Sequence, residues 1–286
     1  MKGIVLAGGT GSRLWPMTKS VSKQLLPIYD KPMIYYPIST LMLAGIRNIL
    51  IITTPQDGNA FQALLGDGSD FGVSFSFATQ PEPKGLAQAF IIGEEFISDQ
   101  SCLMILGDNI FHGVGLGHEI GRVLPEQGAH IFTYMVSNPS DYGILDIDQD
   151  GEPIAITEKP KQPSSRLAVT GLYFFDQRVC DLAKMVKPSA RGELEITSII
   201  QSYLDLHELS MTQLGRGTTW LDTGNPRTLN DAADYIRIIE ERTGLKIACL
   251  EEIAWNFKWI TDTDLLRQAD RYSENEYGKY LKNLLG

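Results

Sequence analysis

Glycines and a permanent cation follow the first apolar segment of the chain. The run Ile4–Ala7 does not alternate with polar residues, which predicts a strand buried on both faces of a sheet. It is followed by Gly8, Gly9, Gly11, Ser12 and Arg13. Glycine lets a ligand approach the backbone closely, and a guanidinium suits phosphate oxygens. These residues favour a polyphosphate-binding loop, although a tight turn with a surface arginine fits them equally well.

Two familiar phosphate-binding patterns do not fit this loop. A P-loop needs a lysine followed by serine or threonine, but Arg13 and Leu14 stand at those positions. The dinucleotide pattern begins at Gly9 and Gly11 and meets Leu14 where its third glycine belongs. The second predicted strand also ends without a carboxylate for a ribose hydroxyl. The loop therefore supports neither a P-loop ATPase nor a nicotinamide dehydrogenase.

Two aspartates follow predicted strands at the edge where open α/β sheets bind ligands. Asp108 comes after the apolar run Cys102–Leu106, and Asp222 comes after Trp220-Leu221. Mg²⁺ takes oxygen ligands and often only one or two protein carboxylates. The pair predicts a magnesium site, while a helix cap or turn remains the alternative for each residue.

Further polar residues stand soon after the glycine loop (Lys23), at the ends of predicted strands (Gln80, Glu158 and Lys159) and before a predicted helix (Arg191). The cations could bind phosphate, the Glu158–Lys159 pair a sugar phosphate, and the Gln80 amide a base edge. Exposed surface charge, or a polar strand cap for Gln80, remains the alternative. No histidine, among His112, His118, His130 and His207, lies in a nucleophile motif, so covalent catalysis is not indicated.

Composition limits the classes of function. The 286 residues are 43% hydrophobic and carry a formal net charge of −10 without a lysine/arginine cluster, which argues against a nucleic-acid partner. Three cysteines at unrelated spacings form neither a metal pattern nor a disulfide framework. The N-terminus lacks a leader pattern, and no run approaches roughly 18 apolar residues. We therefore expect a cytoplasmic protein and no membrane partner.

Strand and helix patterns alternate in the first half of the chain, and short strands with turns follow after about residue 129. Strands are predicted at 4–7, 46–53, 73–79, 102–106, 130–136, 144–147, 154–157, 168–175 and 211–214, and helices at 33–44, 61–65, 86–96, 195–207 and 226–242. This order predicts a Rossmann-like α/β fold whose mixed, mostly parallel central sheet has helices on both faces, followed by a helical C-terminal segment. We expect one domain, 1–286, with a nucleotide-binding half (1–128), a sugar-binding half (129–224) and a helical segment (225–286).

Taken together, these stretches resemble the sugar-phosphate nucleotidyltransferases. The matching stretches are Leu6–Leu14 with Pro16, Ser22–Pro27, Gln80-Pro81 with Gly85–Ala87, Gly107–Asn109, Tyr142-Gly143, Glu158–Pro160, Val169–Tyr173, Arg191–Thr197, Trp220–Gly224 and Lys246–Glu252. Their order along the chain makes them jointly far more specific than any one motif. Gln24 favours the thymidylyl-transferring branch of the family.

The resemblance implies a role for each matching residue. Nucleotide binding would involve Gly8, Gly9, Gly11, Ser12, Arg13, Lys23, Gln24, Gln80, Gly85 and Asp108. Sugar-phosphate binding would involve Asn109, Gly143, Glu158, Lys159, Val169 and Arg191. Arg13, Lys23 and Lys159 would be the catalytic cations, and Asp108 with Asp222 would hold the Mg²⁺ cofactor.

The implied reaction transfers the thymidylyl group of dTTP to glucose 1-phosphate, giving dTDP-glucose and pyrophosphate. The dTDP-glucose would enter deoxysugar synthesis. The alternatives are the same chemistry with UTP or another hexose 1-phosphate, or a non-catalytic nucleotide-sugar sensor. The resemblance also implies a homotetramer and feedback inhibition at a second site. The candidates for that site are Gly115, His118, Glu119 and the Glu251-Glu252 pair, for which an ordinary surface helix is the alternative.

Overall fold

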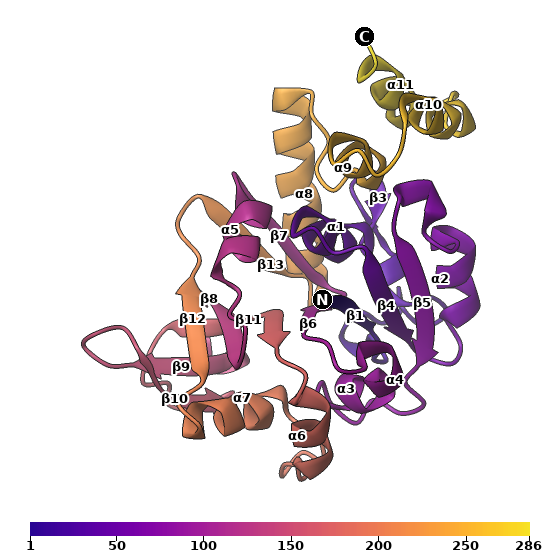
Figure 1. Cartoon of the computed structure of the whole chain (residues 1–286). Helices are drawn as coiled ribbons and strands as arrows, with labels where there is room; N and C mark the ends of the chain where they lie inside the picture. Colours follow the sequence, from indigo (N-terminus) through magenta and orange to yellow (C-terminus); the bar gives the residue numbers. More distant parts are fainter.

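A nine-stranded mixed sheet forms the centre of the computed structural model, which describes residues 1–286 (Figure 1). Its main order is β10-β9-β11-β6-β1-β4-β5, and β8 pairs with β11 on one side and β12 on the other. The strands are β1 (Lys2–Ala7), β4 (Asn48–Thr53), β5 (Ser74–Thr79), β6 (Cys102–Leu106), β8 (Ala129–Met135), β9 (Gly143–Ile147), β10 (Pro153–Glu158), β11 (Leu167–Phe175) and β12 (Leu209–Gln213). The sheet therefore runs without interruption through both halves of the chain.

The predicted mixed sheet is confirmed, and it is only partly parallel. Strands β6, β1, β4 and β5 are parallel neighbours, as are β8 and β12. Strand β11 runs antiparallel to β6, β8 and β9, and β9 runs antiparallel to β10. Antiparallel neighbours need only short turns, whereas parallel ones need long crossovers. The closely spaced strands after residue 129 account for the antiparallel part.

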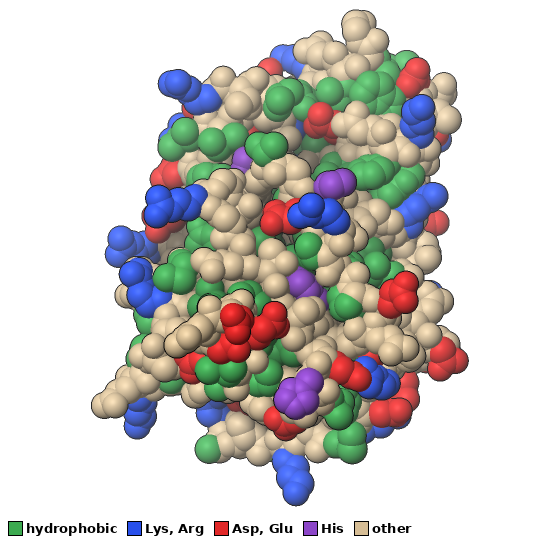
Figure 2. Space-filling view, turned by 60° about the vertical axis from the view of Figure 1, so that its left-hand side comes forward, with side chains coloured by type: hydrophobic (Ala, Val, Ile, Leu, Met, Phe, Trp, Pro, Cys, Tyr) green, Lys and Arg blue, Asp and Glu red, His purple; other side chains and the backbone are tan.

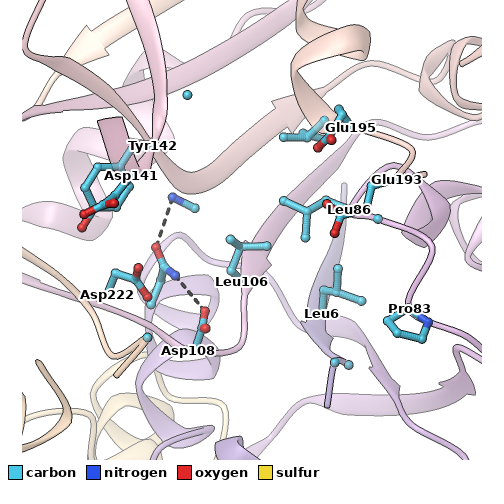
Figure 3. A pocket seen from close by; sticks show the side chains of 18 of the residues that line it. Leu6, Pro83, Leu86, Leu106, Asp108, Asp141, Tyr142, Glu193, Glu195 and Asp222 are labelled. Carbon is cyan, nitrogen blue, oxygen red and sulfur yellow. Dashed lines mark hydrogen bonds between the residues drawn. The ribbon is translucent and has the colours of Figure 1, made fainter. Parts of the chain in front are cut away.

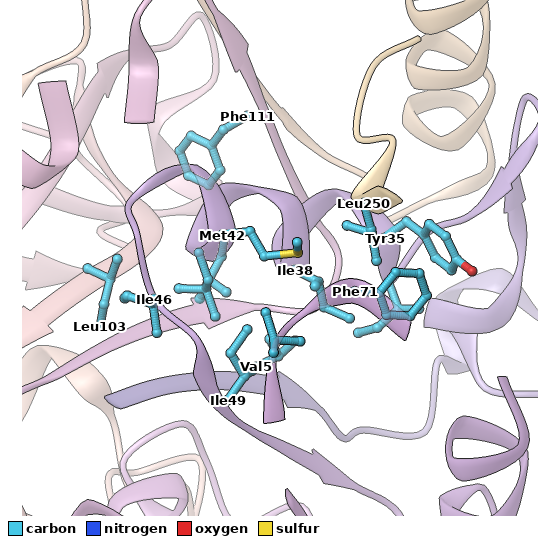
Figure 4. Close-up of a cluster of buried hydrophobic side chains, with 14 of the residues drawn as sticks. Val5, Tyr35, Ile38, Met42, Ile46, Ile49, Phe71, Leu103, Phe111 and Leu250 are labelled. Atoms are coloured by element: carbon cyan, nitrogen blue, oxygen red, sulfur yellow. The ribbon is translucent and has the colours of Figure 1, made fainter. Parts of the chain in front are cut away.

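Helices cover both faces of the sheet. They are α1 (Tyr35–Leu43), α2 (Gly58–Leu65), α3 (Gln88–Ile92), α4 (Glu94–Ile97), α5 (Leu116–Val123), α6 (Val179–Met185), α7 (Ile196–Asp205), α8 (Pro226–Thr243), α9 (Leu250–Asn256), α10 (Asp262–Arg271) and α11 (Glu276–Asn283). Along β1, Val5 points into the core that contains Ile38 of α1 (Figure 4). Ile4 points to the opposite core, with Phe90 of α3. Both faces of β1 are buried, which explains why its sequence does not alternate.

Four features differ from the predicted elements. The helix expected at 86–96 is two short helices, α3 and α4, because the backbone leaves the helical conformation at Gly93, where φ is −87° and ψ is 5°. Glycine is unfavourable inside a helix. Helix α6 was not predicted. A separate antiparallel ribbon joins β7 (Asn109–Gly113) to β13 (Thr218–Asp222), and a small hairpin joins β2 (Pro27–Ile28) to β3 (Lys31–Pro32).

The C-terminal segment is helical, as predicted. Helix α8 begins at a capping box between Asn225 and Thr228 and ends at Gly244, whose φ of 71° is in the left-handed region. Helices α10 and α11 lie at one end of the molecule, near the C-terminus (Figure 1). No helix in the chain combines the length and apolar character needed to span a membrane. The division into segments at residues 128 and 224 remains an interpretation of the sequence.

Candidate active site

One large cavity, of about 500 Å³, opens at the carboxyl ends of β1 and β6 and extends to β10, β11 and α7 (Figure 3). It brings together every site residue predicted from the sequence: Gly8, Gly9, Gly11, Ser12, Arg13, Lys23, Gln24, Gln80, Gly85, Asp108, Asn109, Gly143, Glu158, Lys159, Val169, Arg191 and Asp222. These residues come from distant parts of the chain. Their individual roles remain predictions.

The glycine loop starts where β1 ends. Gly9 has a φ of 95°, and no atom lies within 4 Å of the position that a Cβ would take, so the loop backbone is open to the cavity. Gly11 is also left-handed, with a φ of 58°, and its carbonyl accepts a hydrogen bond from Thr18 Oγ1 at 2.7 Å. The following short 3-10 helix buries Leu14 and leaves Arg13 exposed at the cavity. The loop therefore presents backbone and one cation to a ligand.

Lys23 and Asp108 form a close ion pair on the floor of the cavity. Their Nζ and Oδ2 atoms lie 2.6 Å apart, and the Lys23 side chain is only 8% exposed. Asn109 Nδ2 donates to the other Asp108 oxygen at 2.9 Å. Burial by itself would raise the pKa of Asp108, but the Lys23 charge and these hydrogen bonds lower it below its usual value. Lys23 is therefore a buried, paired cation and not a solvated surface residue.

Asp222 reaches the cavity on the β7–β13 ribbon, and the prediction that it ends a strand of the central sheet is wrong. It is the last residue of β13 and pairs with Asn109 of β7. Thr223 Oγ1 donates to the Asp108 carbonyl at 2.9 Å, which fixes the two segments together. The Asp222 carboxylate makes no hydrogen bond within the chain. Burial, and next the negative charge of Asp108, raise its pKa to about 6.

This pair of carboxylates fits a Mg²⁺ ion. Burial is the main cause of the raised pKa of Asp222, and the negative charge of Asp108 adds to it; a bound cation would offset both effects. No group of three or more His, Cys, Asp or Glu side chains is arranged to hold a metal ion. The donor set therefore suits an ion that completes its coordination with water and substrate phosphate, as Mg²⁺ does.

Charged residues gather on the opposite wall. Arg191 Nη2 lies 2.8 Å from Glu195 Oε1 and 3.2 Å from Glu158 Oε1, and Lys159 Nζ lies 3.8 Å from the same Glu158 oxygen. Lys159 has a φ of 42°, an unusual conformation for a side chain other than glycine. Burial raises the pKa of Glu158 despite the neighbouring Lys159. The wall offers carboxylate and cationic groups to a sugar phosphate.

Gln80 closes the cavity beside the glycine loop. Its side chain amide donates to Gln88 Oε1 at 2.9 Å and to the Gly85 carbonyl at 3.3 Å. Its Oε1 faces Gly8 so closely that a Cβ at Gly8 would clash with it. Gly85 has a φ of 110° and its backbone lies against Leu194. The amide is thus held by other groups and is not a free strand cap.

Several cavity residues were not singled out from the sequence. Trp220 Nε1 donates to Asn109 Oδ1 at 2.6 Å, which orients the Asn109 amide so that its nitrogen faces Asp108. Tyr173 and Glu195 also line the cavity. In the sequence Trp220 and Tyr173 stand among apolar strand residues, a pattern typical of core. The motif Arg191–Thr197 contains Glu195 but does not indicate what it contacts.

The candidates for a second site lie on helices that both pack on α1. Gly115 precedes α5, and Glu251 and Glu252 belong to α9. Glu251 is fully buried and accepts a hydrogen bond from Tyr277, so its carboxylate is not available to a ligand from solvent. Glu252 accepts one from Tyr280.

Figure 2 shows acidic and basic side chains interspersed on the face that it displays.

A model of the nucleotidyl transferase family matches residues 2–237. The chain belongs to this family. Among nucleotidyl transferases it is similar to the glucose-1-phosphate thymidylyltransferases of Neisseria meningitidis, at 53% identity over all of this chain and 99% of the other, and of Mycolicibacterium smegmatis, at 54% with the same coverage. It is accordingly an enzyme of the nucleotidyltransferase class, so the sensor alternative is not supported.

Solved structures of nucleotidyl transferases share the fold. A Bacillus anthracis structure described as a glucose-1-phosphate thymidylyltransferase, in complex with a sucrose, matches with a TM-score of 0.77 and 40% identity, over 83% of this chain and 95% of that one. A UDP-glucose pyrophosphorylase complexed with UDP-glucose matches with a TM-score of 0.74 at 23% identity, over 83% and 98%. The second likeness concerns the fold alone.

Proposed function

We propose that the enzyme transfers the thymidylyl group of dTTP to glucose 1-phosphate, giving dTDP-glucose and pyrophosphate. The observation that carries this proposal is that one cavity contains the Asp108 and Asp222 carboxylates together with two sets of cations from different segments of the chain. Arg13 and Lys23 form one set, and Lys159 and Arg191 form the other. Full-length relatives at 53% and 54% identity carry the name of this activity, which supports the assignment.

The nucleotide is assigned to the side of the cavity formed by the glycine loop. The open backbone at Gly9 and the Arg13 guanidinium suit a triphosphate. The segment that contains Gln80 and Gly85, together with Gln24, would contact the thymine base. Arg13 and Lys23 would share the contacts with the phosphates, which explains why the loop has no lysine at the P-loop position.

The sugar phosphate is assigned to the opposite wall. Glu158 and Asn109 would accept and donate hydrogen bonds to sugar hydroxyls, and Gly143 and Val169 would line the ring. Arg191 and Lys159 would bind the phosphate, since both are cations at the edge of this wall. Trp220 would fix the Asn109 amide for this contact.

The residues support a direct displacement. A phosphate monoester is largely dianionic at neutral pH, its second pKa being about 6, so it can attack the α-phosphorus in line without a general base. The cavity accordingly contains cations, amides and carboxylates and no histidine. A Mg²⁺ held by Asp108 and Asp222 would neutralise charge on the phosphates. Lys159 and Arg191 would hold the nucleophile in position, and Arg13 would stabilise the leaving pyrophosphate.

The proposal also covers the oligomeric state, location and pathway of the enzyme. We propose a cytoplasmic homotetramer that supplies deoxysugar synthesis, such as the dTDP-rhamnose pathway of polysaccharides. It also comprises feedback control at a second site that includes Gly115, His118, Glu119 and Glu252. The support is the identity with thymidylyltransferases and the common packing of α5 and α9 on α1.

A panel of substrates tests the proposal. Pyrophosphate release is measured with dTTP, UTP and ATP, each with glucose 1-phosphate, galactose 1-phosphate or mannose 1-phosphate. The dTTP and glucose 1-phosphate pair should give the highest kcat/KM. Higher kcat/KM with UTP or with another sugar phosphate would replace the assigned substrate, and no release with any pair would contradict the activity.

A further inference from the structure

A single carboxylate oxygen accepts several hydrogen bonds on the cavity wall that carries Glu158, Lys159 and Arg191. Glu195 Oε1 accepts hydrogen bonds from Ser189 Oγ at 2.7 Å, from Arg191 Nη2 at 2.8 Å and from Arg191 Nε at 3.2 Å. The Glu195 residue is 8% exposed, and its side chain lies at the cavity (Figure 3). A buried carboxylate with a guanidinium partner is the stronger class of ion pair, because solvent screens it less.

Glu195 stands on a rigid part of the backbone. Its neighbour Leu194 donates to the Lys84 carbonyl at 2.6 Å and accepts from the Ala87 amide at 3.1 Å. On the other side, Ile196 begins helix α7 and is 4% exposed. The Glu195 carboxylate is therefore fixed relative to both the Gly85 segment and the helix.

Arg191 stands on a short turn, in which its amide donates to Ser189 Oγ at 3.2 Å and the Ser189 amide donates to the Glu193 carbonyl at 2.9 Å. The turn is closed by a hydrogen bond from the Gly192 amide to the Ser189 carbonyl at 2.8 Å, and Gly192 has a φ of 77°. The Arg191 side chain is 41% exposed, and its Nη1 group makes no hydrogen bond within the chain. Glu195 holds the Nε and Nη2 edge, so Nη1 is left for a ligand.

Two other carboxylates contact Arg191 more loosely. Glu158 lies 3.2 Å and Glu193 3.4 Å from Nη2, and the Glu193 side chain is 46% exposed. An exposed pair of this kind contributes little, because water competes for both partners. Glu193 is thus a natural control for Glu195: it has the same charge and the same partner, but it is exposed.

We infer that Glu195 is a positioning residue, which holds the Arg191 guanidinium so that its free Nη1 edge faces the sugar phosphate. The inference rests on the proposed function for the identity of that phosphate. Glu195 itself makes no contact with substrate in this account. Its effect passes through Arg191, and the loss of either residue should have the same consequence.

Kinetics with each substrate varied in turn test the inference. Glu195→Gln keeps the shape of the side chain but removes its charge, and charge-assisted hydrogen bonds are roughly twice as strong as neutral ones. The KM for glucose 1-phosphate should rise about tenfold, while the KM for dTTP stays within about twofold. Glu193→Gln should leave both values within about twofold. Glucose 1-phosphate binding, measured by calorimetry, should weaken by the same factor as the KM rises.

A double-mutant cycle separates positioning from a general structural role. In an Arg191→Gln background, Glu195→Gln should have no further effect on the KM for glucose 1-phosphate, because its partner is already absent. If Glu195→Gln lowers thermal stability so far that it does not fold, Ser189→Ala supplies the readout. That variant removes a donor to Glu195 Oε1 and the acceptor of the Arg191 amide, and both losses act on the position of Arg191, so it should raise only the KM for glucose 1-phosphate.

Three results would each contradict the positioning role. They are additive effects in the cycle, an equal rise in both KM values, and a Glu195→Gln enzyme that behaves like Glu193→Gln. The wild type separates the two claims. A wild type that makes no dTDP-glucose contradicts the proposed function, and the calorimetric comparison of the variants then still decides the role of Glu195. An active wild type with unaltered Glu195→Gln kinetics contradicts the positioning role alone.

Discussion

The Lys23 ammonium and the Asp108 carboxylate are each other's counter-ion, 2.6 Å apart at the floor of the cavity. In the proposed function, each has a second partner of its own: a phosphate for Lys23 and Mg²⁺ for Asp108. The ion pair gives each of these two groups a partner of opposite charge, and a buried charge without a partner is costly. Binding of the metal–nucleotide complex would then exchange one set of ionic contacts for another.

Removal of the Asp108 charge should abolish most activity. Asp108→Asn keeps an oxygen that can accept the Lys23 hydrogen bond, so we expect the protein to fold, with lower stability because the buried Lys23 loses its counter-ion. We expect turnover to fall by about 10²–10³-fold, because the metal loses a carboxylate ligand. Steady-state turnover at saturating Mg²⁺ is the measurement, and circular dichroism is the control for folding. Unchanged Mg²⁺-dependent turnover would remove Asp108 from the metal site.

Removal of divalent metal should stop the reaction and leave the fold intact. Asp108 is held by hydrogen bonds to Asn109 and Thr223, and the Asp222 backbone is held by the pairing of β13 with β7, so the site does not need the ion to form. Treatment with a chelator should therefore abolish pyrophosphate release without a change in thermal midpoint, and added Mg²⁺ should restore it. Full activity after exhaustive chelation would rule out a metal-dependent mechanism.

A methyl group at Gly85 should destabilise the protein more than one at Gly151. Both glycines are left-handed, with φ of 110° and 87°, so alanine introduces backbone strain at each. At Gly85 the new Cβ would also lie 2.6 Å from the Leu194 nitrogen, whereas nothing lies within 4 Å at Gly151. We expect Gly151→Ala to lower the free energy of unfolding by about 1 kcal/mol and Gly85→Ala by about 3 kcal/mol or more.

Denaturant unfolding of the two variants measures this difference. Gly85→Ala should also impair activity, because the backbone contact between Gly85 and Leu194 joins the two walls of the cavity. Equal stability losses in the two variants would mean that the contact with Leu194 is not as tight as described.

His130 should make stability depend on pH. It is 3% exposed and lies between Ser210 Oγ at 2.8 Å and Thr212 Oγ1 at 3.0 Å, and burial lowers its pKa to about 4. The unfolded chain takes up a proton near pH 6.5, so the unfolded state binds more protons between pH 6.5 and 4. The stabilisation from neutral His130 is thus complete above pH 6.5 and is lost as the pH falls toward 4.

This contribution amounts to about 2–3 kcal/mol. Unfolding free energies measured from pH 7.5 to 4 should fall less steeply in His130→Gln than in the wild type. His118→Gln, at an exposed histidine, controls for the loss of an imidazole. A His130→Gln profile parallel to that of the wild type would show that His130 is not the group responsible.

Most of the fold was predictable because apolar runs mark buried strands. Cys102–Leu106 coincides with β6, since a strand buried on both faces has no polar residue until it reaches the sheet edge. The β7–β13 ribbon was not predictable, because its pairing joins residues more than a hundred positions apart. A local sequence pattern cannot predict pairing between residues so far apart in the chain.

Motifs in the sequence pointed to residues that line one cavity, but they did not predict the contacts between these residues. Lys23 stands between a serine and an apolar run, which suits a surface residue, and only the fold brings Asp108 to it. The raised pKa of Asp222 likewise depends on Asp108, which arrives on a different strand. Such long-range electrostatic relationships follow from topology and not from local sequence.

The most direct test of the account is the product itself. The enzyme is incubated with equimolar dTTP and glucose 1-phosphate in the presence of Mg²⁺, with the α-phosphorus of dTTP isotopically labelled, and the products are separated by mass spectrometry. We predict dTDP-glucose that carries all of the label and an equal amount of unlabelled pyrophosphate. Labelled dTMP or dTDP without dTDP-glucose, or no consumption of dTTP, would contradict thymidylyl transfer.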